Sequence, residues 1–110
     1  MDLSYEVKES YAEIKAAGRL NMVSAPKLRE MVADVIAEGT SRIVVNLEDT
    51  AFMDSSGLGA LIGCLKAARQ AGGDLRIAAV QPQVQMVLGL TSMDKVLTSH
   101  PSAAEAFSHD

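Results

Sequence analysis

The stretch RIVVNLEDTAFMDSSGLGAL, residues 42–61, decides the fold, because it joins a buried strand to an amphipathic helix through one short loop. Residues 42–47 begin with a β-branched run that lacks polar alternation, which is typical of a strand covered on both faces. EDTAFMDS, residues 48–55, is predicted to form the loop, which runs into the start of the helix. Residues 55–71 are predicted to form a helix that ends at Gly72. The apolar face of this helix comprises Leu58, Leu61, Ile62, Leu65 and Ala68.

The residues before this stretch predict a hairpin and a further helix. Residues 4–9 and 11–17 have the pattern of two short strands, and Gly18 breaks the second of them. We expect Ser24 to be the N-cap of the helix that follows, and Gly39 to be its C-cap. The buried stripe of this helix is predicted to comprise Leu28, Met31, Val32, Val35 and Ile36.

The residues after the stretch predict further strands and helices. Residues 74–80 are expected to form a strand, and Pro82 is expected to begin a helix, because its missing N–H costs nothing in a first turn. Residues 94–99 are expected to add a short edge strand, and residues 101–107 a final helix. The side chains of the Pro82 helix that are expected to face inward are Val84, Val87, Leu88 and Leu90.

Strands and helices therefore alternate along the whole chain. Alternation of this kind with short loops predicts an α/β fold with a mixed, mostly parallel sheet, an N-terminal antiparallel hairpin and about four helices. The length of 110 residues fits one domain, which we place at residues 1–110.

The composition excludes several kinds of function. No apolar run approaches the roughly 18 residues that a membrane span needs. The net charge of −4, without any block of Lys or Arg, argues against nucleic-acid binding. The first residues resemble neither a secretory signal nor a transit peptide, so we expect a cytoplasmic protein. The single cysteine, Cys64, is expected to be a buried thiol, and we expect no cofactor and no metal ion.

The candidate site lies in residues 48–59, where the chain leaves the central strand and enters the helix. In open α/β sheets, functional groups gather at the carboxyl ends of the strands. This segment is rich in Asp and Ser, and N-capping alone would explain such residues ahead of an apolar helix. Capping is compatible with function, so the question is which residue caps the helix.

Two residues compete for the N-cap position. With Asp54 as the cap, Met53 and Leu58 occupy the two positions of a hydrophobic staple, and Ser55 falls at N1 with a free hydroxyl. With Ser55 as the cap, the corresponding pair is Asp54 and Gly59, which makes no apolar contact. The staple therefore favours Asp54.

The same helix carries three glycines, Gly57, Gly59 and Gly63. Each costs about 1 kcal/mol relative to alanine in a helix interior, so a compensating reason is expected. On a helical wheel, Gly59 and Gly63 lie beside Ser56 and away from the apolar face. Two interpretations stay open. The bare backbone lets another protein approach closely, or the glycines pack under a neighbouring helix.

The chain resembles the STAS-domain family, and specifically the bacterial anti-anti-sigma factors, also called anti-sigma factor antagonists. The resemblance rests on FMDSSGLGAL at residues 52–61, on the strand RIVVNL before it and on GGDLRIA at residues 72–78 after it. It extends to GRLNMVSAPKLR at residues 18–29, so it covers nearly the whole chain.

The resemblance implies a regulatory cycle centred on Ser55. In that family, the serine after the aspartate of D-S-x-G is phosphorylated by a partner that is both an anti-sigma factor and a serine kinase. The unphosphorylated antagonist binds this partner and frees a sigma factor, the phosphorylated antagonist does not bind, and a serine phosphatase resets the cycle. The residues that the resemblance places at the partner-binding site are Asp54, Ser56, Gly57, Leu58, Gly59 and Gly63.

One position departs from the family pattern. The family's early G-x-L-D segment usually has an aspartate where this chain has Asn21, which the resemblance also places at the partner-binding site. The resemblance implies that a contact from that carboxylate to the kinase is weakened or replaced. The identity of the partner therefore stays open. The sequence also leaves the oligomeric state of the chain open.

Three other functions fit parts of the sequence. A serine hydrolase needs a glycine two residues before its nucleophile and a histidine base, but Ser55 lacks that glycine, and His100 and His109 lie near the end of the chain, so we expect no enzyme. A receiver domain would use Asp54 as its phosphate acceptor, but it also needs an acidic pair for Mg²⁺, which this chain lacks. A STAS scaffold or transporter-associated subunit without a phosphorylation cycle is the alternative that stays open.

Overall fold

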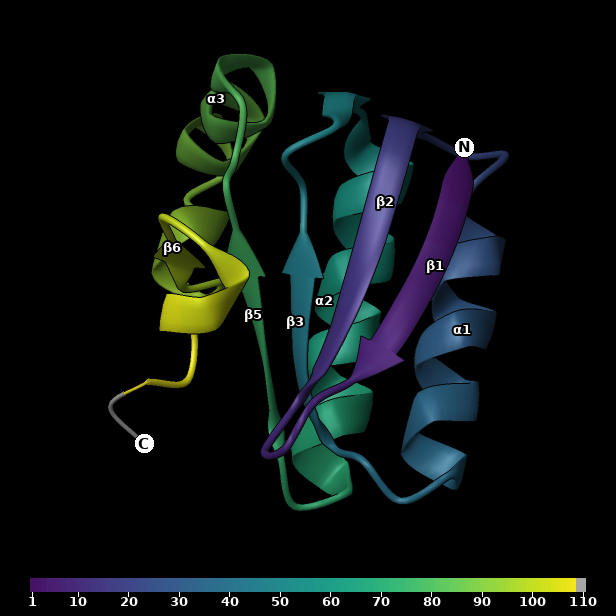
Figure 1. The fold of residues 1–110 in the computed structure, drawn as a ribbon. Coiled ribbons are helices and arrows are strands. Elements are labelled where there is room, and N and C mark those ends of the chain that lie inside the picture. Colours follow the sequence, from purple (N-terminus) through teal and green to yellow (C-terminus); the bar gives the residue numbers. More distant parts are fainter. Residues whose placement is uncertain (109–110) are drawn as a thin grey trace.

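A mixed sheet of six strands forms the centre of the computed structural model, which describes residues 1–108 (Figure 1). Its strands are β1 (Asp2–Val7), β2 (Ala12–Leu20), β3 (Arg42–Asn46), β4 (Thr50–Met53), β5 (Asp74–Ala78) and β6 (Ser99–His100). β1 pairs antiparallel with β2, and β3, β5 and β6 follow as parallel neighbours. β4 lies off this row and pairs in parallel with the end of β2.

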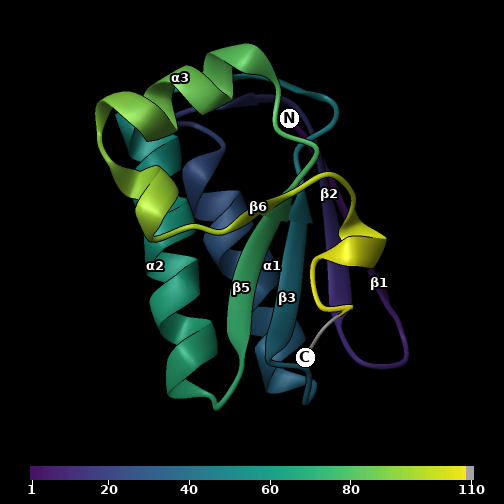
Figure 2. The same cartoon turned by 90° about the vertical axis from the view of Figure 1, so that its left-hand side faces the viewer.

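The helices complete the fold of the described chain. They are α1 (Ala25–Ala37), α2 (Ser55–Gln70) and α3 (Pro82–Leu90), with the 3-10 turns η1 (Met93–Lys95) and η2 (Ala103–Glu105). α1 and α2 lie side by side on one face of the sheet, and the C-terminal segment lies on the opposite face (Figure 2). This arrangement confirms the predicted α/β class and the antiparallel hairpin. None of the helices within residues 1–108 is long and apolar enough to cross a membrane.

A glycine follows the C-cap of both α1 and α2. Gly39, predicted as the C-cap of α1, lies one residue beyond the C-cap Glu38 and has a φ of 108°. Its N–H donates to the Ile36 carbonyl at 3.0 Å, and the N–H of Thr40 donates to the Val35 carbonyl at 3.2 Å. Gly72 follows α2 in the same way, with a φ of 88°. A left-handed residue at this place lets the last helical carbonyls find donors, and glycine adopts that conformation without strain.

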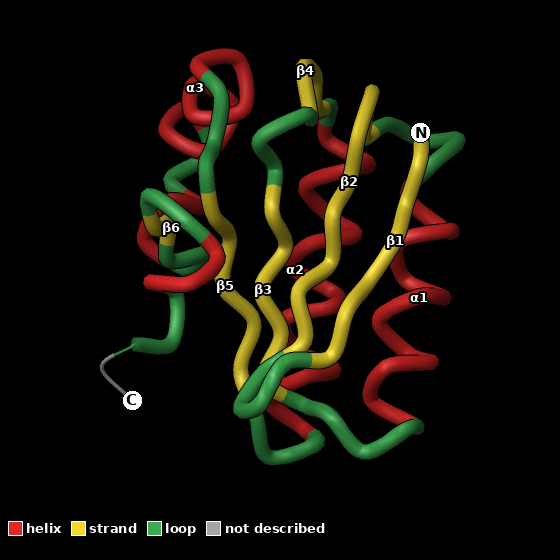
Figure 3. The backbone as a smooth tube through the Cα atoms, in the orientation of Figure 1, coloured by secondary structure: helices red, strands yellow, loops and turns green. Residues whose placement is uncertain are grey.

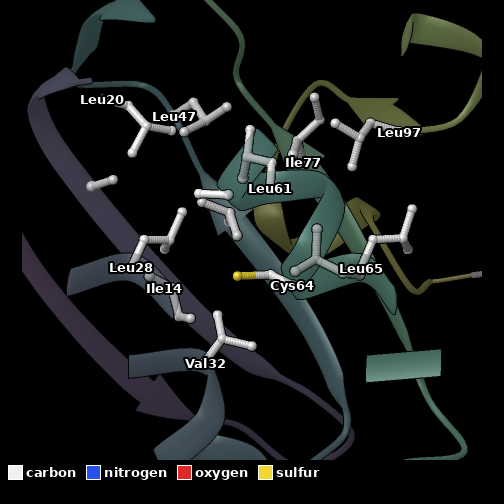
Figure 4. Close-up of a cluster of buried hydrophobic side chains, with 14 of the residues drawn as sticks. Ile14, Leu20, Leu28, Val32, Leu47, Leu61, Cys64, Leu65, Ile77 and Leu97 are labelled. Atoms are coloured by element: carbon white, nitrogen blue, oxygen red, sulfur yellow. The ribbon is translucent and has the colours of Figure 1, made fainter. Parts of the chain in front are cut away.

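The main core lies between the sheet and the inner faces of α1 and α2 (Figure 4). The predicted apolar faces meet there, with Leu28 from α1 and Leu61 and Leu65 from α2 almost wholly buried. Cys64 lies among them, and burial raises the pKa of its thiol to about 11. The thiol is therefore protonated at neutral pH, in agreement with the predicted buried, unreactive cysteine.

The predicted boundaries are wrong at the carboxyl edge of the sheet. β2 continues through Gly18 to Leu20, and residues 50–53, predicted as a loop, form β4 beside this extension. Gly18 has a φ of 116° at an irregularity in the pairing, which lets the strand bend and continue. The buried Thr50 hydroxyl donates to the Ala16 carbonyl at 2.7 Å and so ties the start of β4 to β2.

Three predictions for the last third of the chain are also wrong. The edge strand expected at residues 94–99 is replaced by η1 and then β6, which pairs with β5 over two residues. The final helix expected at residues 101–107 is reduced to η2, so the described chain has three α-helices and not about four. Leu90 is 80% exposed, because Val84 and Leu88 fill the buried side of the short α3.

The C-terminal segment is held on the second face of the sheet by aromatic and cationic contacts. Phe107 stacks on Tyr11, with ring centroids 6.0 Å apart. The guanidinium groups of Arg42 and Arg76 lie 4.7 and 4.3 Å from the centre of the Phe107 ring. Arg76 also donates to the Ala106 carbonyl at 2.7 Å. These contacts anchor the segment without a regular helix.

Candidate functional site at the start of α2

The carboxyl ends of the parallel strands lead to a group of loops and helix starts at one edge of the molecule (Figure 3). β4 ends at Met53, α2 begins at Ser55, and the extension of β2 ends at Leu20 beside them. The loop at residues 21–24 leads from β2 into α1 and shares a groove with the first turns of α2. The structure thus joins this loop to the segment at residues 48–59, where the sequence places the site.

Asp54 caps α2, as the staple predicts. Its backbone is extended, with φ −105° and ψ −174°, and its carboxylate accepts the N–H of Gly57 at 2.9 Å. Met53 and Leu58 are both buried in the main core, where the staple requires them. Ser55 therefore occupies N1. Its side chain is exposed, and its hydroxyl makes no hydrogen bond within residues 1–108.

The first turn of α2 also carries free backbone donors. Asp54 accepts the N–H of Gly57, whereas the N–H groups of Ser55 and Ser56 have no acceptor in the described part of the chain. These N–H groups lie at the N-terminus of α2, where the positive end of the helix dipole favours an anion. A negatively charged group attached to Ser55 would therefore meet donors at the helix start.

Gly57 and Leu58 form the buried side of the first turn of α2. A Cβ on Gly57 would overlap the backbone oxygen of Leu20 and lie 2.8 Å from the Cγ of that residue, so the first turn of α2 sits directly against the end of β2. Leu58 is buried in the main core. The resemblance implies that both residues belong to the partner-binding site, which stays a prediction. The structure shows that both are buried, so they fix the place where Ser55 emerges.

Gly59 and Gly63 lie on the side of α2 that borders α1, and both are exposed. A Cβ at Gly59 would lie 3.8 Å from Nη2 of Arg29, and a Cβ at Gly63 would lie 3.8 Å from its Nε. The Arg29 side chain therefore runs along these glycines without burying them. The glycines adjoin a neighbouring helix and yet leave their backbone accessible, so both interpretations stay open.

Asn21 organises the loop between β2 and α1. Its side-chain oxygen accepts the N–H groups of Val23 at 3.0 Å and Ser24 at 3.2 Å. The Ser24 hydroxyl donates to the Arg19 carbonyl at 2.7 Å, so Ser24 occupies the predicted N-cap position without a side-chain cap bond to α1. An amide oxygen accepts such bonds as a carboxylate oxygen does. The side chain of Asn21 therefore holds the turn of this loop.

Two exposed apolar side chains beside the site are not predicted from the sequence. Met22 and Val23 are each 71% exposed. Exposed apolar side chains next to a groove are typical of protein interfaces. The available signal is the pair of large apolar residues within a loop, where turn residues are usually polar. The groove has a volume of about 500 Å³ and is lined by Met22, Ala25, Pro26, Arg29, Ser56 and Gly59.

Arg19 and His100 are further chemically active side chains among the described residues. The Arg19 guanidinium lies 4.4 Å from the centre of the Phe52 ring on β4, where it makes a cation–π contact. Within residues 1–108, no group of three or more His, Cys, Asp or Glu side chains is placed to hold a metal ion. His100 is half-buried in β6, and His109 lies outside the described residues.

The fold and the site together define a class of domain. A mixed sheet presents an exposed serine at the start of a glycine-bearing helix, next to an apolar loop and an open groove. A family model described as the STAS domain matches residues 2–106. The chain belongs to the STAS-domain family.

Comparison with curated proteins is more specific. The anti-sigma-B factor antagonist of Staphylococcus aureus is 32% identical to this chain over 99 residues, which cover 88% of this chain and 92% of that protein. Within the STAS-domain family, the chain is therefore placed with the anti-sigma factor antagonists.

Two solved structures share the fold. An anti-sigma factor antagonist from Mycobacterium paratuberculosis has a TM-score of 0.84 at 24% identity, with 96% of this chain and 89% of that chain covered. The Bacillus cell fate determinant SpoIIAA in its phosphorylated form has a TM-score of 0.72 at 22% identity, with 96% of each chain covered. At these identities the likeness establishes the fold alone.

Proposed function

We propose that this chain is a cytoplasmic anti-sigma factor antagonist whose partner is an anti-sigma factor with serine kinase activity. The unphosphorylated chain binds this partner, so that a sigma factor is released. The partner phosphorylates Ser55, which ends the binding, and a serine phosphatase restores the hydroxyl. The chain supplies the serine and the docking surface, and it performs no catalysis itself.

The observation that carries this proposal is the free hydroxyl of Ser55. Asp54 caps α2, so Ser55 is exposed at N1 and available to a kinase. The similarity to an anti-sigma-B factor antagonist supports the choice of partner. The structural likeness to a protein solved in a phosphorylated form is compatible with phosphorylation on this fold.

Phosphorylation is expected to act at the interface and to leave the fold intact. A phosphate adds about −1.5 to −2 charges and three acceptor oxygens. The free N–H groups of Ser55 and Ser56 and the helix dipole favour it by about 0.3–1 kcal/mol, whereas the adjacent Asp54 carboxylate repels it. Because these effects offset each other in part, the domain stays folded while the bulk and charge of the phosphate block docking.

Mapping of the phosphate tests the proposal. The chain is incubated with ATP and, one at a time, with the anti-sigma factor kinases encoded in the same genome, and the modified residue is located by mass spectrometry. We expect one phosphate, on Ser55, and none in the Ser55→Ala variant. Ser56→Ala is the matched control and should be phosphorylated like the parent. Modification of Ser56, or of no residue with any kinase, would contradict the proposal and favour a STAS scaffold or transporter-associated subunit without a phosphorylation cycle.

Gly59→Ala is expected to raise the stability of the chain and to weaken docking. The new Cβ would lie at an ordinary contact distance of 3.8 Å from Arg29. We therefore expect the free energy of unfolding to rise by about 1 kcal/mol in urea denaturation. The same methyl group protrudes from the bare face beside Ser56, so the affinity for the anti-sigma factor should fall about tenfold in calorimetric titration.

Gly89→Ala provides the control for this prediction. Gly89 lies near the end of α3, and a Cβ there would meet nothing within 4 Å. This variant should be stabilised in a similar way and should keep the parent affinity. An unchanged affinity of Gly59→Ala would place the docking surface away from the α2 glycines.

A further inference from the structure

β4 pairs with β2 along its inner edge, and a side chain bonds to its outer edge, which faces away from β2. On the inner side, the N–H of Asp54 donates to the Leu20 carbonyl of β2 at 3.2 Å. On the outer side, the N–H of Met53 donates to Oε1 of Gln83 at 2.8 Å, and Nε2 of Gln83 donates to the Met53 carbonyl at 3.1 Å. One amide group therefore makes both bonds that a neighbouring strand would make.

The first turn of α3 supports this arrangement. Gln83 is the second residue of α3 and is half-buried, and α3 packs against β4 at the carboxyl edge of the sheet (Figure 3). Gln81, the N-cap of α3, donates from its side chain to the carbonyl of Glu48. The start of α3 thus bonds to Glu48 and Met53, which are the two ends of the segment that leads through Asp54 to Ser55.

We infer that Gln83 is a positioning residue for Ser55. β4 has only four residues and one neighbouring strand, so few bonds determine its place. Asp54, between Met53 and Ser55, bonds to the end of β2 and to the first turn of α2. With Met53 held, Asp54 caps α2 and Ser55 emerges in one orientation. The functional part of this inference rests on the proposed phosphorylation of Ser55, and the structural part is independent of it.

Loss of the Gln83 amide would leave two backbone groups without partners. Met53 is 1% exposed, and an unpaired N–H and C=O at such a place are costly. In a variant without this amide, residues 48–53 are expected to lower the cost by opening to water, and β4 then separates from α3. The opening moves Asp54 as well, so the cap of α2 and the orientation of Ser55 are disturbed together.

Amide hydrogen exchange measured by NMR on the full chain tests the structural part. Gln83→Met keeps the length of the side chain and removes its amide. Gln85→Met makes the same change at an exposed position of the same helix and is the matched control. In Gln83→Met, exchange at Met53, Asp54 and Gly57 should be faster by about tenfold or more, with β3 unchanged. In Gln85→Met, none of these rates should change.

Faster exchange at Met53 alone would overturn the inference, because Met53 would then have lost only its own acceptor while Asp54 and Gly57 stayed in place. If Gln83→Met opens the whole domain, so that β3 also exchanges quickly, Gln83→Glu takes its place. That variant keeps an acceptor for the Met53 N–H, but its second carboxylate oxygen faces the Met53 carbonyl where the parent chain has a donor. It should show the same local pattern, and the absence of that pattern also overturns the inference.

Kinetics with a kinase that phosphorylates the parent chain test the functional part. A positioning role predicts that kcat for Gln83→Met falls about tenfold, while KM changes by less than about twofold, because the groove residues that dock the partner are untouched. An unchanged kcat, or an increase in KM alone, would overturn the functional part. If no kinase phosphorylates the parent chain, the proposed function fails, and the exchange rates still decide whether Gln83 positions Ser55.

Discussion

Replacing Gly57 with alanine is expected to lower the free energy of unfolding by about 3 kcal/mol. The new Cβ would overlap the backbone oxygen of Leu20 and lie 2.8 Å from its Cγ. Leu20 is fully buried at the end of β2, so it has no room to move aside in a closely packed core. The start of α2 must shift instead, and Ser55 shifts with it.

Urea denaturation measures this effect, and Gly59→Ala is its control. The two variants add the same methyl group to the same helix two residues apart. Alanine clashes with β2 at Gly57 but fits at Gly59, so the two substitutions should change the stability in opposite directions. A loss below about 1 kcal/mol for Gly57→Ala would contradict the close packing of α2 on β2.

A permanent negative charge at Ser55 is expected to have the second large effect. Ser55→Asp should weaken binding to the anti-sigma factor by at least about 100-fold, because an unpaired charge buried in an interface costs about 2–5 kcal/mol. Ser55→Ala adds no charge and should bind with the parent affinity whether or not ATP is present. Isothermal titration calorimetry with the purified anti-sigma factor measures both affinities.

Two controls separate this effect from unfolding and from charge alone. Ser55→Asp should keep the parent midpoint in urea, because an aspartate at N1 meets the positive end of α2. Ser4→Asp adds the same charge at an exposed position on β1 and should leave the affinity unchanged. Tight binding by Ser55→Asp, or by stoichiometrically phosphorylated protein, would show that Ser55 lies outside the interface.

Local patterns in the sequence determined α1, α2 and β3, together with the free hydroxyl of Ser55. Met53, Asp54 and Leu58 fall within six consecutive positions, so the cap and the staple are recognisable without knowledge of what packs on them. The glycine after α2 is a signal of the same kind. These rules depend on neighbours along the chain, and the structure confirms them.

Contacts between distant parts of the chain decided the elements that were predicted wrongly. Residues 50–53 form a strand because the bent end of β2 lies beside them. Residues 101–107 need no long helix, because Phe107 is held by Arg42 and Arg76 on two strands of the sheet. In the sequence, Gly57 resembles a residue of a docking surface. Only the close approach of β2 to α2 in the structure shows that Gly57 is buried.

Gln83 gives the clearest case of what only the tertiary structure decided. In the sequence, Gln83 and Gln85 are equivalent polar residues on one short helix. In the fold, Gln83 bonds to the backbone of Met53, which lies 30 residues earlier in the chain, whereas Gln85 is exposed. The sequence by itself determined that Ser55 is free at the start of α2. The packing of α3 against β4 decided which side chain holds the segment that presents it, because that bond depends on the relative placement of two elements and not on the pattern within either.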